Sequence, residues 1–123
     1  MTKLINSEMK YTTDEQVTVV GTVYINGAPA LLLRSIDGEP IAHATINMSD
    51  KIALPDMHVV IKDYAENEGV LQTLIEGGIV EDTGNEVQHG HVKSRICAIV
   101  DLDMIDEIME DKERAVSDGR YDS

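Results

Sequence analysis

Two histidines, His89 and His91, come nearest to a chemical site by residue type and spacing. The pattern from Val87 to Val100 predicts one long strand, on which the two imidazoles point to the same side. Imidazoles two residues apart on a strand lie about 7 Å apart and can converge on one metal ion. Such a site needs at least one more ligand, and the next side chains on that side, Lys93 and Arg95, would repel a cation.

The same basic side chains allow two other interpretations. They could bind an anion or a phosphate group, or they could form a charged strand face that pairs with nearby carboxylates and prevents strand-to-strand aggregation. The charged face needs no ligand, and we favour it; the metal half-site stays the alternative. An enzyme here would have to join His89 or His91 with Glu66 or Glu68 across the sheet.

Other arrangements that carry catalysis are missing from the sequence. No glycine-rich phosphate loop opens a helix, and no serine stands in a nucleophile elbow. The single cysteine, Cys97, belongs to an apolar run and has no neighbouring base, so we expect it in the core. Four tyrosines without Trp or Phe disfavour an aromatic-lined pocket. We therefore predict that the protein is not an enzyme and needs no cofactor.

The chain carries 23 acidic and 10 basic residues, a formal net charge of −13 over 123 residues. This charge repels nucleic-acid backbones and anionic membranes, so we expect neither as a direct partner. It favours a basic protein, which can itself be a nucleic-acid-binding protein of a bacterial host. The sequence shows no secretory signal and no apolar run of membrane-spanning length, which predicts a cytosolic protein. The oligomeric state stays open, a homodimer included.

A small α+β domain must position these residues. Two turns have glycine signatures, Asn26-Gly27 and Asp37-Gly38, and alternating or apolar runs predict strands on either side of them. The expected strands are Val17–Ile25 with a bulge at Gly21, Ala30–Ile36, Ile41–Met48, Met57–Ile61 and Val87–Val100, with a polar loop over Glu81–Glu86. Together they predict a mainly antiparallel sheet of four or five strands, covered by one central helix and a C-terminal amphipathic helix.

The central helix is predicted from Tyr64 to Glu76. Asp63 is the expected N-cap, and Glu66 three residues later would complete a capping box. Gly69 falls inside this helix, where glycine costs about 1 kcal/mol relative to alanine. Either a neighbouring strand or helix packs too closely there for a Cβ, or the backbone is open to a ligand or partner. The pair Gly77-Gly78 is expected to end the helix.

The composition changes at Asp101, because the chain from there to its end holds nine acids and three bases. Apolar residues at helical spacing predict an amphipathic helix from about Leu102 to Ala115. Its stripe consists of Leu102, Ile105, Ile108, Met109 and Val116. The stripe can dock on the protein's own sheet or be presented to a partner. The two are compatible, because a docked helix still displays its acidic face.

These elements divide the chain into a polar N-terminal arm (residues 1–16), a single α+β domain (residues 17–116) and a disordered acidic tail (residues 117–123). Polar side chains, all but one of them carboxylates, are the candidate partner-binding groups on both helices. They are Asp103, Asp106, Glu107, Glu110 and Asp111 on the C-terminal helix, with Glu66, Asn67 and Glu68 on the central one. No catalytic residue is assigned.

The string Lys-Asp-Tyr-Ala-Glu-Asn-Glu-Gly at Lys62–Gly69, preceded by Gly38–Met48, resembles a family of small uncharacterised proteins of bacteriophages and other mobile elements. The resemblance extends from Gly38 to Val100. It implies a product that acts inside a bacterium, and it brings no catalytic residues. Near Gln88–Val92 the relatives more often have a polar turn before a short apolar strand, and the His-Gly-His sequence of this chain departs from them.

From these features we expect a small acidic phage or mobile-element accessory protein that acts by stoichiometric protein binding, for example by inhibiting a host or defence factor. Two alternatives stay open. One is a small metal- or ligand-dependent enzyme centred on the strand with His89 and His91. The other is a nucleic-acid mimic, in which carboxylates of the C-terminal helix and neighbouring loops imitate the spacing of phosphates.

Overall fold

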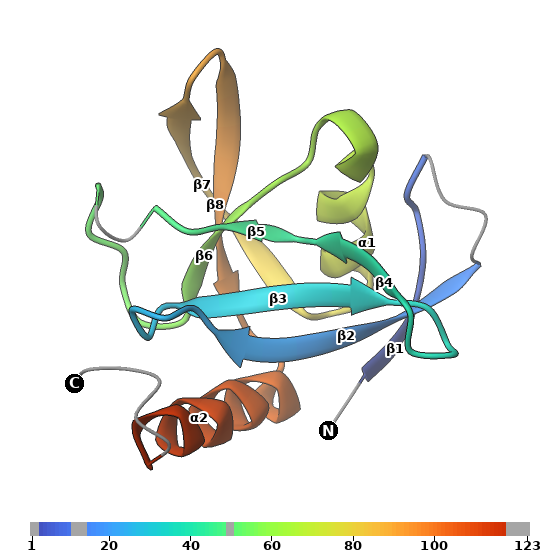
Figure 1. The fold of residues 1–123 in the computed structure, drawn as a ribbon. Coiled ribbons are helices and arrows are strands. Elements are labelled where there is room, and N and C mark those ends of the chain that lie inside the picture. The colour runs from blue at the N-terminus through green and yellow to red at the C-terminus, as the bar shows by residue number, and fades with distance from the viewer. Residues whose placement is uncertain (1–2, 11–14, 49–50, 118–123) are drawn as a thin grey trace.

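The computed structural model describes residues 3–10, 15–48 and 51–117, and its strands form two antiparallel sheets of four strands each (Figure 1). The first contains, in spatial order, β1 (Lys3–Asn6), β2 (Gln16–Val23), β3 (Pro29–Arg34) and β4 (Pro40–His43). The second contains β5 (Thr45–Ile46), β6 (His58–Ile61), β8 (Val92–Ile99) and β7 (Val80–His89). The helical elements are η1 (Ala65–Asn67), α1 (Val70–Glu76) and α2 (Leu102–Ser117). The predicted α+β class with a C-terminal helix is confirmed, with two sheets in place of one.

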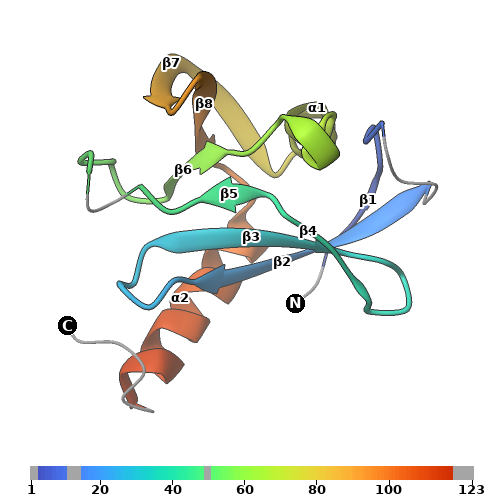
Figure 2. The ribbon, with the colours of Figure 1, turned by 45° about the horizontal axis from the view of Figure 1, so that its top comes forward.

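The apolar core joins both sheets and both helices. The sheets contribute alternate positions that are almost completely covered, among them Val17, Val19, Leu31, Leu33, Val59, Ile61, Cys97 and Ile99. The helices add Val70 and Leu74 from α1 and Met104 and Ile108 from α2. Figures 1 and 2 show α1 and α2 at opposite ends of the molecule, with the sheets between them.

The strand predicted over Ile41–Met48 is divided between the two sheets. Ala44 is the point of transfer and is fully buried. Its amide donates to the Leu31 carbonyl at 2.9 Å, and its carbonyl accepts from the Lys62 amide at 2.8 Å. One small residue thus connects both sheets. The prediction of a single strand was wrong because a hydrophobic pattern does not show to which sheet a residue belongs.

Both predicted turns are present. Gly27 and Gly38 take φ of 84° and 90° and close the β2–β3 and β3–β4 connections. The bulge predicted at Gly21 is wrong, since this residue keeps a regular register opposite Leu31. α2 crosses β2 at this point, and a Cβ on Gly21 would lie 2.7 Å from Cγ1 of Ile108. The absence of a side chain at Gly21 therefore lets α2 pack closely against β2.

The polar arm predicted over residues 1–16 is wrong for the part that the structure describes. β1 pairs antiparallel with β2, and Ile5 and Met9 are buried. These apolar residues are too sparse to form a pattern, so only the tertiary structure reveals that they reach the core. Residues 11–14 lie outside the described residues.

The helix predicted over Tyr64–Glu76 is interrupted, and α1 begins only after Gly69. This glycine takes φ of 100° as the N-cap of α1, while η1 forms a separate turn before it. A Cβ on Gly69 would lie 2.3 Å from the carbonyl oxygen of Glu8. Close packing is therefore confirmed as the reason for the glycine, although the neighbour is an N-terminal segment rather than a strand or helix. α1 ends as predicted, with Gly78 at φ of 75°.

The Asp63 carboxylate binds the start of α1 from the segment that precedes η1. Its Oδ1 accepts hydrogen bonds from the amides of Gly69 and Leu71, both at 3.0 Å. The predicted capping box is wrong, because the carboxylate of Glu66 pairs with Nζ of Lys62 at 2.8 Å instead. The N-cap of α1 is Gly69 and not Asp63 as predicted, although the Asp63 carboxylate does accept amide hydrogen bonds at the start of this helix.

The single strand predicted over Val87–Val100 is a hairpin. β7 ends at His89, the chain turns at Gly90 with φ of 63°, and β8 returns from Val92. The loop predicted over Glu81–Glu86 belongs to β7, which is an edge strand of its sheet. Polar side chains are common on an exposed edge strand, so the composition of this segment is as typical of an edge as of a loop.

The C-terminal helix is confirmed, since α2 covers the predicted segment and extends to Ser117. The rest of the predicted tail, residues 118–123, lies outside the described residues. Among the helices that the structure describes, none has the length and apolar character needed to cross a membrane.

Candidate interaction surface on the C-terminal helix

α2 begins at an ionic contact with the first strand. The Asp101 carboxylate accepts a hydrogen bond from the Met104 amide at 2.9 Å and another from Nζ of Lys3 in β1. Burial favours the neutral acid, but the hydrogen bonds outweigh it and hold the pKa of Asp101 below its ordinary value. The bond to Asp101 likewise raises the pKa of Lys3. The start of the helix is thus capped and tied to β1.

The inner face of α2 covers the edge of β2 with carboxylates. Oε2 of Glu107 accepts a hydrogen bond from the Gly21 amide at 2.7 Å. Oδ2 of Asp111 accepts from the Thr22 hydroxyl at 2.6 Å and from the Val23 amide at 3.1 Å. Within the described residues β1 pairs with the first half of β2 alone, and the two carboxylates bind amides beyond that pairing. Two of the predicted partner-binding acids therefore face the protein itself.

The predicted stripe of α2 is buried only in part, since Ile108 is buried and Ile105 packs partly against the core. Met104, Ile108 and Ala115 are buried, whereas Leu102, Met109 and Val116 are 76%, 46% and 44% exposed. Residues spaced by three or four positions share one face of a helix. Leu102, Ile105, Met109 and Val116 consequently share a second apolar face, which we call the apolar row; Ile105 is partly buried against the core, and the other three are exposed. The predicted stripe mixed two apolar faces of α2, because the docked face combines Ile108 with Met104 and Ala115.

A row of carboxylates follows the apolar row on one flank. Its members recur at spacings of three and four residues and are all exposed: Asp103, Asp106, Glu110 and Glu113, which we call the acidic row. At 3.6 residues per turn, this row lies roughly a quarter turn from the apolar row, on the side away from Ile108. Glu113 is absent from the predicted candidates, although its position three residues after Glu110 continues the spacing.

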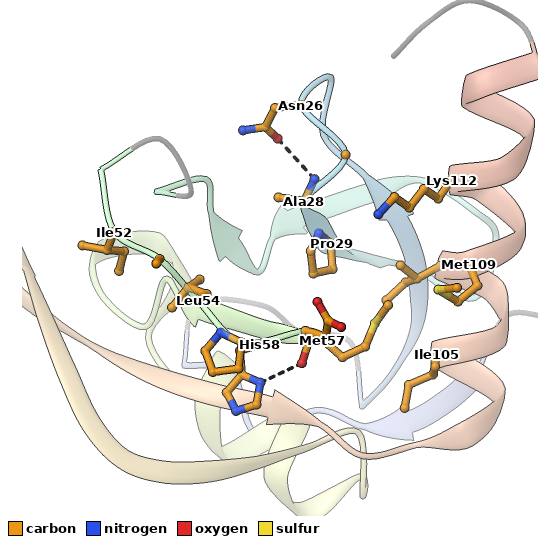
Figure 3. Close-up of a pocket in the computed structure, with 15 residues that line it drawn as sticks. Asn26, Ala28, Pro29, Ile52, Leu54, Met57, His58, Ile105, Met109 and Lys112 are labelled. Atoms are coloured by element: carbon orange, nitrogen blue, oxygen red, sulfur yellow. Dashed lines mark hydrogen bonds between the residues drawn. The ribbon is translucent and has the colours of Figure 1, made fainter. Parts of the chain in front are cut away.

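A groove opens along the other flank of the apolar row (Figure 3). Its volume is about 590 Å³. α2 forms one wall, the loop before β6 forms the other, and the start of β3 lies between them. The apolar lining includes Ile105, Ile108 and Met109 from α2, Ile52, Leu54 and Met57 from the loop, and Pro29. The polar lining residues are Asn26, Asp56, His58 and Lys112.

Backbone hydrogen bonds hold the wall opposite α2. Met57 takes φ of 56°, a conformation that costs a residue with a side chain about 1–2 kcal/mol. Its carbonyl accepts from the Ile99 amide at 2.8 Å, and the His58 amide donates to the Pro55 carbonyl at 3.2 Å. Nδ1 of His58 lies 2.9 Å from the Asp56 carbonyl oxygen, as Figure 3 shows. The groove is therefore part of the fold of the free chain.

The second group of predicted contact residues does not join this surface. Glu66, Asn67 and Glu68 belong to the η1–α1 region, at the end of the molecule opposite α2 (Figure 2). Asn67 is buried, and its Nδ2 donates to the His43 carbonyl at 2.7 Å. Glu66 is paired with Lys62, and Glu68 is exposed. Asn67 thus has a structural role, while the two carboxylates are surface groups.

The two histidines do not lie on one strand as predicted. His89 ends β7, and His91 lies in the turn before β8. Nε of Arg95 donates to Asp82 at 2.9 Å, which holds the pKa of that carboxyl below its ordinary value, and Nη1 lies 3.4 Å from Glu86. This pairing is the one that the charged-face interpretation predicts. Within residues 3–10, 15–48 and 51–117, no three His, Cys, Asp or Glu side chains gather as metal ligands do.

Cys97 is fully buried in the core, as predicted. Burial raises the pKa of its thiol to about 12. The thiol is therefore protonated and enclosed at neutral pH, which is unsuited to a nucleophile.

Comparison with protein-family models, with curated proteins and with solved structures found no match. The choice of a candidate site therefore rests on the geometry of this chain. The outer side of α2 combines an aliphatic groove, exposed aliphatic side chains and a regular row of charges, and we take it as the candidate interaction surface.

Proposed function

We propose that this chain is a small acidic accessory protein that binds one basic protein partner stoichiometrically and catalyses no reaction. The observation that carries the proposal is the division of α2 into three faces. One face docks on β2, the second carries the apolar row with Leu102, Met109 and Val116 exposed, and the third carries the exposed acidic row. A helix that served only its own fold would need the first face alone.

The charge of the molecule favours a basic partner. A net charge of −13 steers positively charged surfaces toward the protein and repels other anions. On docking, the acidic row can pair with lysines and arginines at the rim and fix the register, while the apolar row is covered. A protein whose own ligand is nucleic acid carries a basic surface of this kind.

The biological setting of the proposal rests on the resemblance of Lys62–Gly69 to phage and mobile-element proteins. In that setting the protein acts in the bacterial cytosol and blocks a host or defence factor by occupying its basic surface. The acidic row favours a second candidate, a nucleic-acid mimic. With a rise of 1.5 Å per residue, its carboxylates are spaced by about 4.5–6 Å along the helix axis and present a linear array of negative charge.

The test is affinity purification of the tagged full chain from the bacterial host, with two matched double variants. One variant reverses the acidic row with Asp106→Lys and Glu110→Lys. The other, with Asp37→Lys and Glu39→Lys, makes the same change in charge on the exposed β3–β4 turn. Each reversal adds two charges, so both variants change the net charge from −13 to −9.

The proposal expects a one-to-one complex with the wild type and with the β3–β4 turn variant, and its loss with the acidic-row variant. If both variants retain the partner, or both lose it to the same extent, the outer side of α2 is not the binding surface. A partner that duplex DNA displaces in competition, and that leaves as salt rises to physiological strength, would identify the protein as a nucleic-acid mimic.

A further inference from the structure

We infer that the groove beside α2 anchors one amphipathic helix of the partner, with aliphatic side chains in the groove and lysines or arginines against the acidic row. This inference rests on the proposed function and specifies the site and the form of the partner.

The groove offers aliphatic surface on several sides. Ile105 and Met109 belong to the α2 wall, Leu54 and Met57 to the opposite wall, and Pro29 lies between them (Figure 3). Its volume of about 590 Å³ falls in the range of pockets that enclose ligands. Methionines stand on both walls and adapt to side chains of different shape. The groove therefore suits the aliphatic residues of another protein segment.

The occupant is a helix and not an added strand, because the backbone groups that border the groove offer few partners to a strand. Pro29 has no amide, the Leu31 amide and carbonyl bind Thr45 and Ala44, and the His58 amide donates to the Pro55 carbonyl. The stretch of β2 beyond β1 uses the amides of Gly21 and Val23 to bind Glu107 and Asp111. A helix satisfies its own backbone, so only its side chains need to enter the groove.

The apolar row continues the groove along α2. From Leu102 to Val116 the helix rises about 21 Å, which is roughly four turns. A helix that packs along this length places a side chain against the row at every third or fourth residue. Leu102 and Met109, which are 76% and 46% exposed, would be covered by it.

The charges decide between a foreign partner and a second copy of the chain. Two copies would bring together two acidic rows and two net charges of −13, which repel. A basic helix meets the acidic row on one flank of its aliphatic stripe and Asp56 in the lining of the groove on the other. Lys112 also lines the groove, so we expect an uncharged or acidic residue opposite it.

The probe is a fluorescein-labelled synthetic peptide of about 15 residues, with leucine at every third or fourth position and lysine, arginine and alanine elsewhere. A control peptide has the same composition with the leucines scattered, so that no aliphatic stripe forms. Fluorescence anisotropy measures the binding of both peptides to the full chain.

Two variants of equal charge locate the site. Met109→Glu places a carboxylate on the groove wall, and Ile36→Glu places one on the β3–β4 turn, where Ile36 is 65% exposed. General attraction would strengthen the binding of a basic peptide to both variants. The inference expects the leucine-stripe peptide to bind Ile36→Glu as well as it binds the wild type. It expects this peptide to bind Met109→Glu at least about tenfold more weakly, and the control peptide to bind the wild type more weakly by a similar factor. No binding to the wild type, equal binding of the two peptides or equal binding to the two variants would overturn it.

Methyl NMR on the full chain gives a residue-level result. The Met57 and Met109 methyl signals should shift on addition of the leucine-stripe peptide, while that of Met9, which is buried near α1, should not. Unchanged Met57 and Met109 signals at saturating peptide would contradict the inference.

Co-purification separates a failure of this inference from a failure of the proposed function. If Met109→Glu retains the partner while Asp106→Lys with Glu110→Lys loses it, the groove is not the anchoring site and the proposed function stands. If the wild type binds no protein at all, the proposed function fails as well. A wild-type dimer that Met109→Glu dissociates would assign the groove to a second copy and overturn the inference.

Discussion

The loss of stability on removal of the Asp111 carboxylate distinguishes the acids of α2 that bind β2 from those that face solvent. In the folded chain this carboxylate is 14% exposed and accepts two hydrogen bonds from β2, at 2.6 Å from Thr22 and 3.1 Å from Val23. Arg114 lies 3.6 Å from its other oxygen but is 63% exposed, so that ion pair contributes little. Asp111→Ala therefore removes two charge-assisted bonds and leaves both donors of β2 without this acceptor.

The size of the effect follows from these contacts. A hydrogen bond to a charged group contributes about 1.5–3 kcal/mol when it is protected from water. Thr22 and Val23 are partly exposed, and water can replace the lost acceptor in part. We therefore expect Asp111→Ala to lower the free energy of unfolding by about 2–3 kcal/mol. For a domain of this size, the melting temperature should fall by roughly 6–15 °C.

Urea unfolding followed by circular dichroism measures this loss beside a matched control. Asp106→Ala removes an exposed carboxylate of the acidic row and should change stability by less than about 0.5 kcal/mol. Glu107→Ala, which removes one bond to Gly21, should fall between the two. Equal losses for Asp111→Ala and Asp106→Ala would refute the idea that α2 completes the edge of β2.

Three further predictions concern the packing and titration of the fold. Gly69→Ala should lower the free energy of unfolding in urea by about 3 kcal/mol, because its Cβ would lie 2.3 Å from a backbone oxygen. Gly78→Ala should lower it by only about 1–2 kcal/mol, because the new Cβ has open space around it. The contact with Lys3 lowers the pKa of Asp101, so the stabilisation from this carboxylate is present above the unfolded-state pKa and is lost as pH falls through the folded-state pKa. The difference in the free energy of unfolding between wild type and Asp101→Asn should therefore shrink in acid. A difference that is constant with pH would contradict this. Cys97 should resist thiol reagents in the folded chain and react once urea unfolds it, because burial raises its pKa to about 12; rapid labelling under native conditions would contradict its burial.

Local signals in the sequence predicted the elements that depend on neighbouring residues. Gly27 and Gly38 mark turns because each turn needs a positive φ. α2 could be predicted because its spacing of three and four persists over several turns. Asp63 was predicted as an N-cap from its residue type and from Glu66 three residues later; its carboxylate does accept two amide hydrogen bonds at the start of α1, although the N-cap itself is Gly69.

Errors arose where distant segments decide the structure. The carbonyl of Glu8 approaches Gly69 so closely that the helix starts after the glycine. The sequence of residues 64–76 contains no signal that predicts this contact. β7 is polar because it is an edge strand, so its sequence resembles a loop. Ala44 changes sheets within what looks like one strand.

The candidate site was predictable only in part. The acidic residues of α2 are visible in the sequence, but which of them face solvent depends on the β2 amides that Glu107 and Asp111 bind. The groove joins Pro29, Met57 and Met109, which belong to three distant segments, so no local motif could reveal it.

The most direct test of the proposed binding surface is carboxyl footprinting of the purified complex, in which a carbodiimide labels accessible Asp and Glu side chains. Protection of Asp106 and Glu110 on complex formation, with unchanged labelling of Asp37 and Glu39, is the predicted result. Equal labelling of Asp106 and Glu110 in the free and the bound protein would show that the partner binds elsewhere.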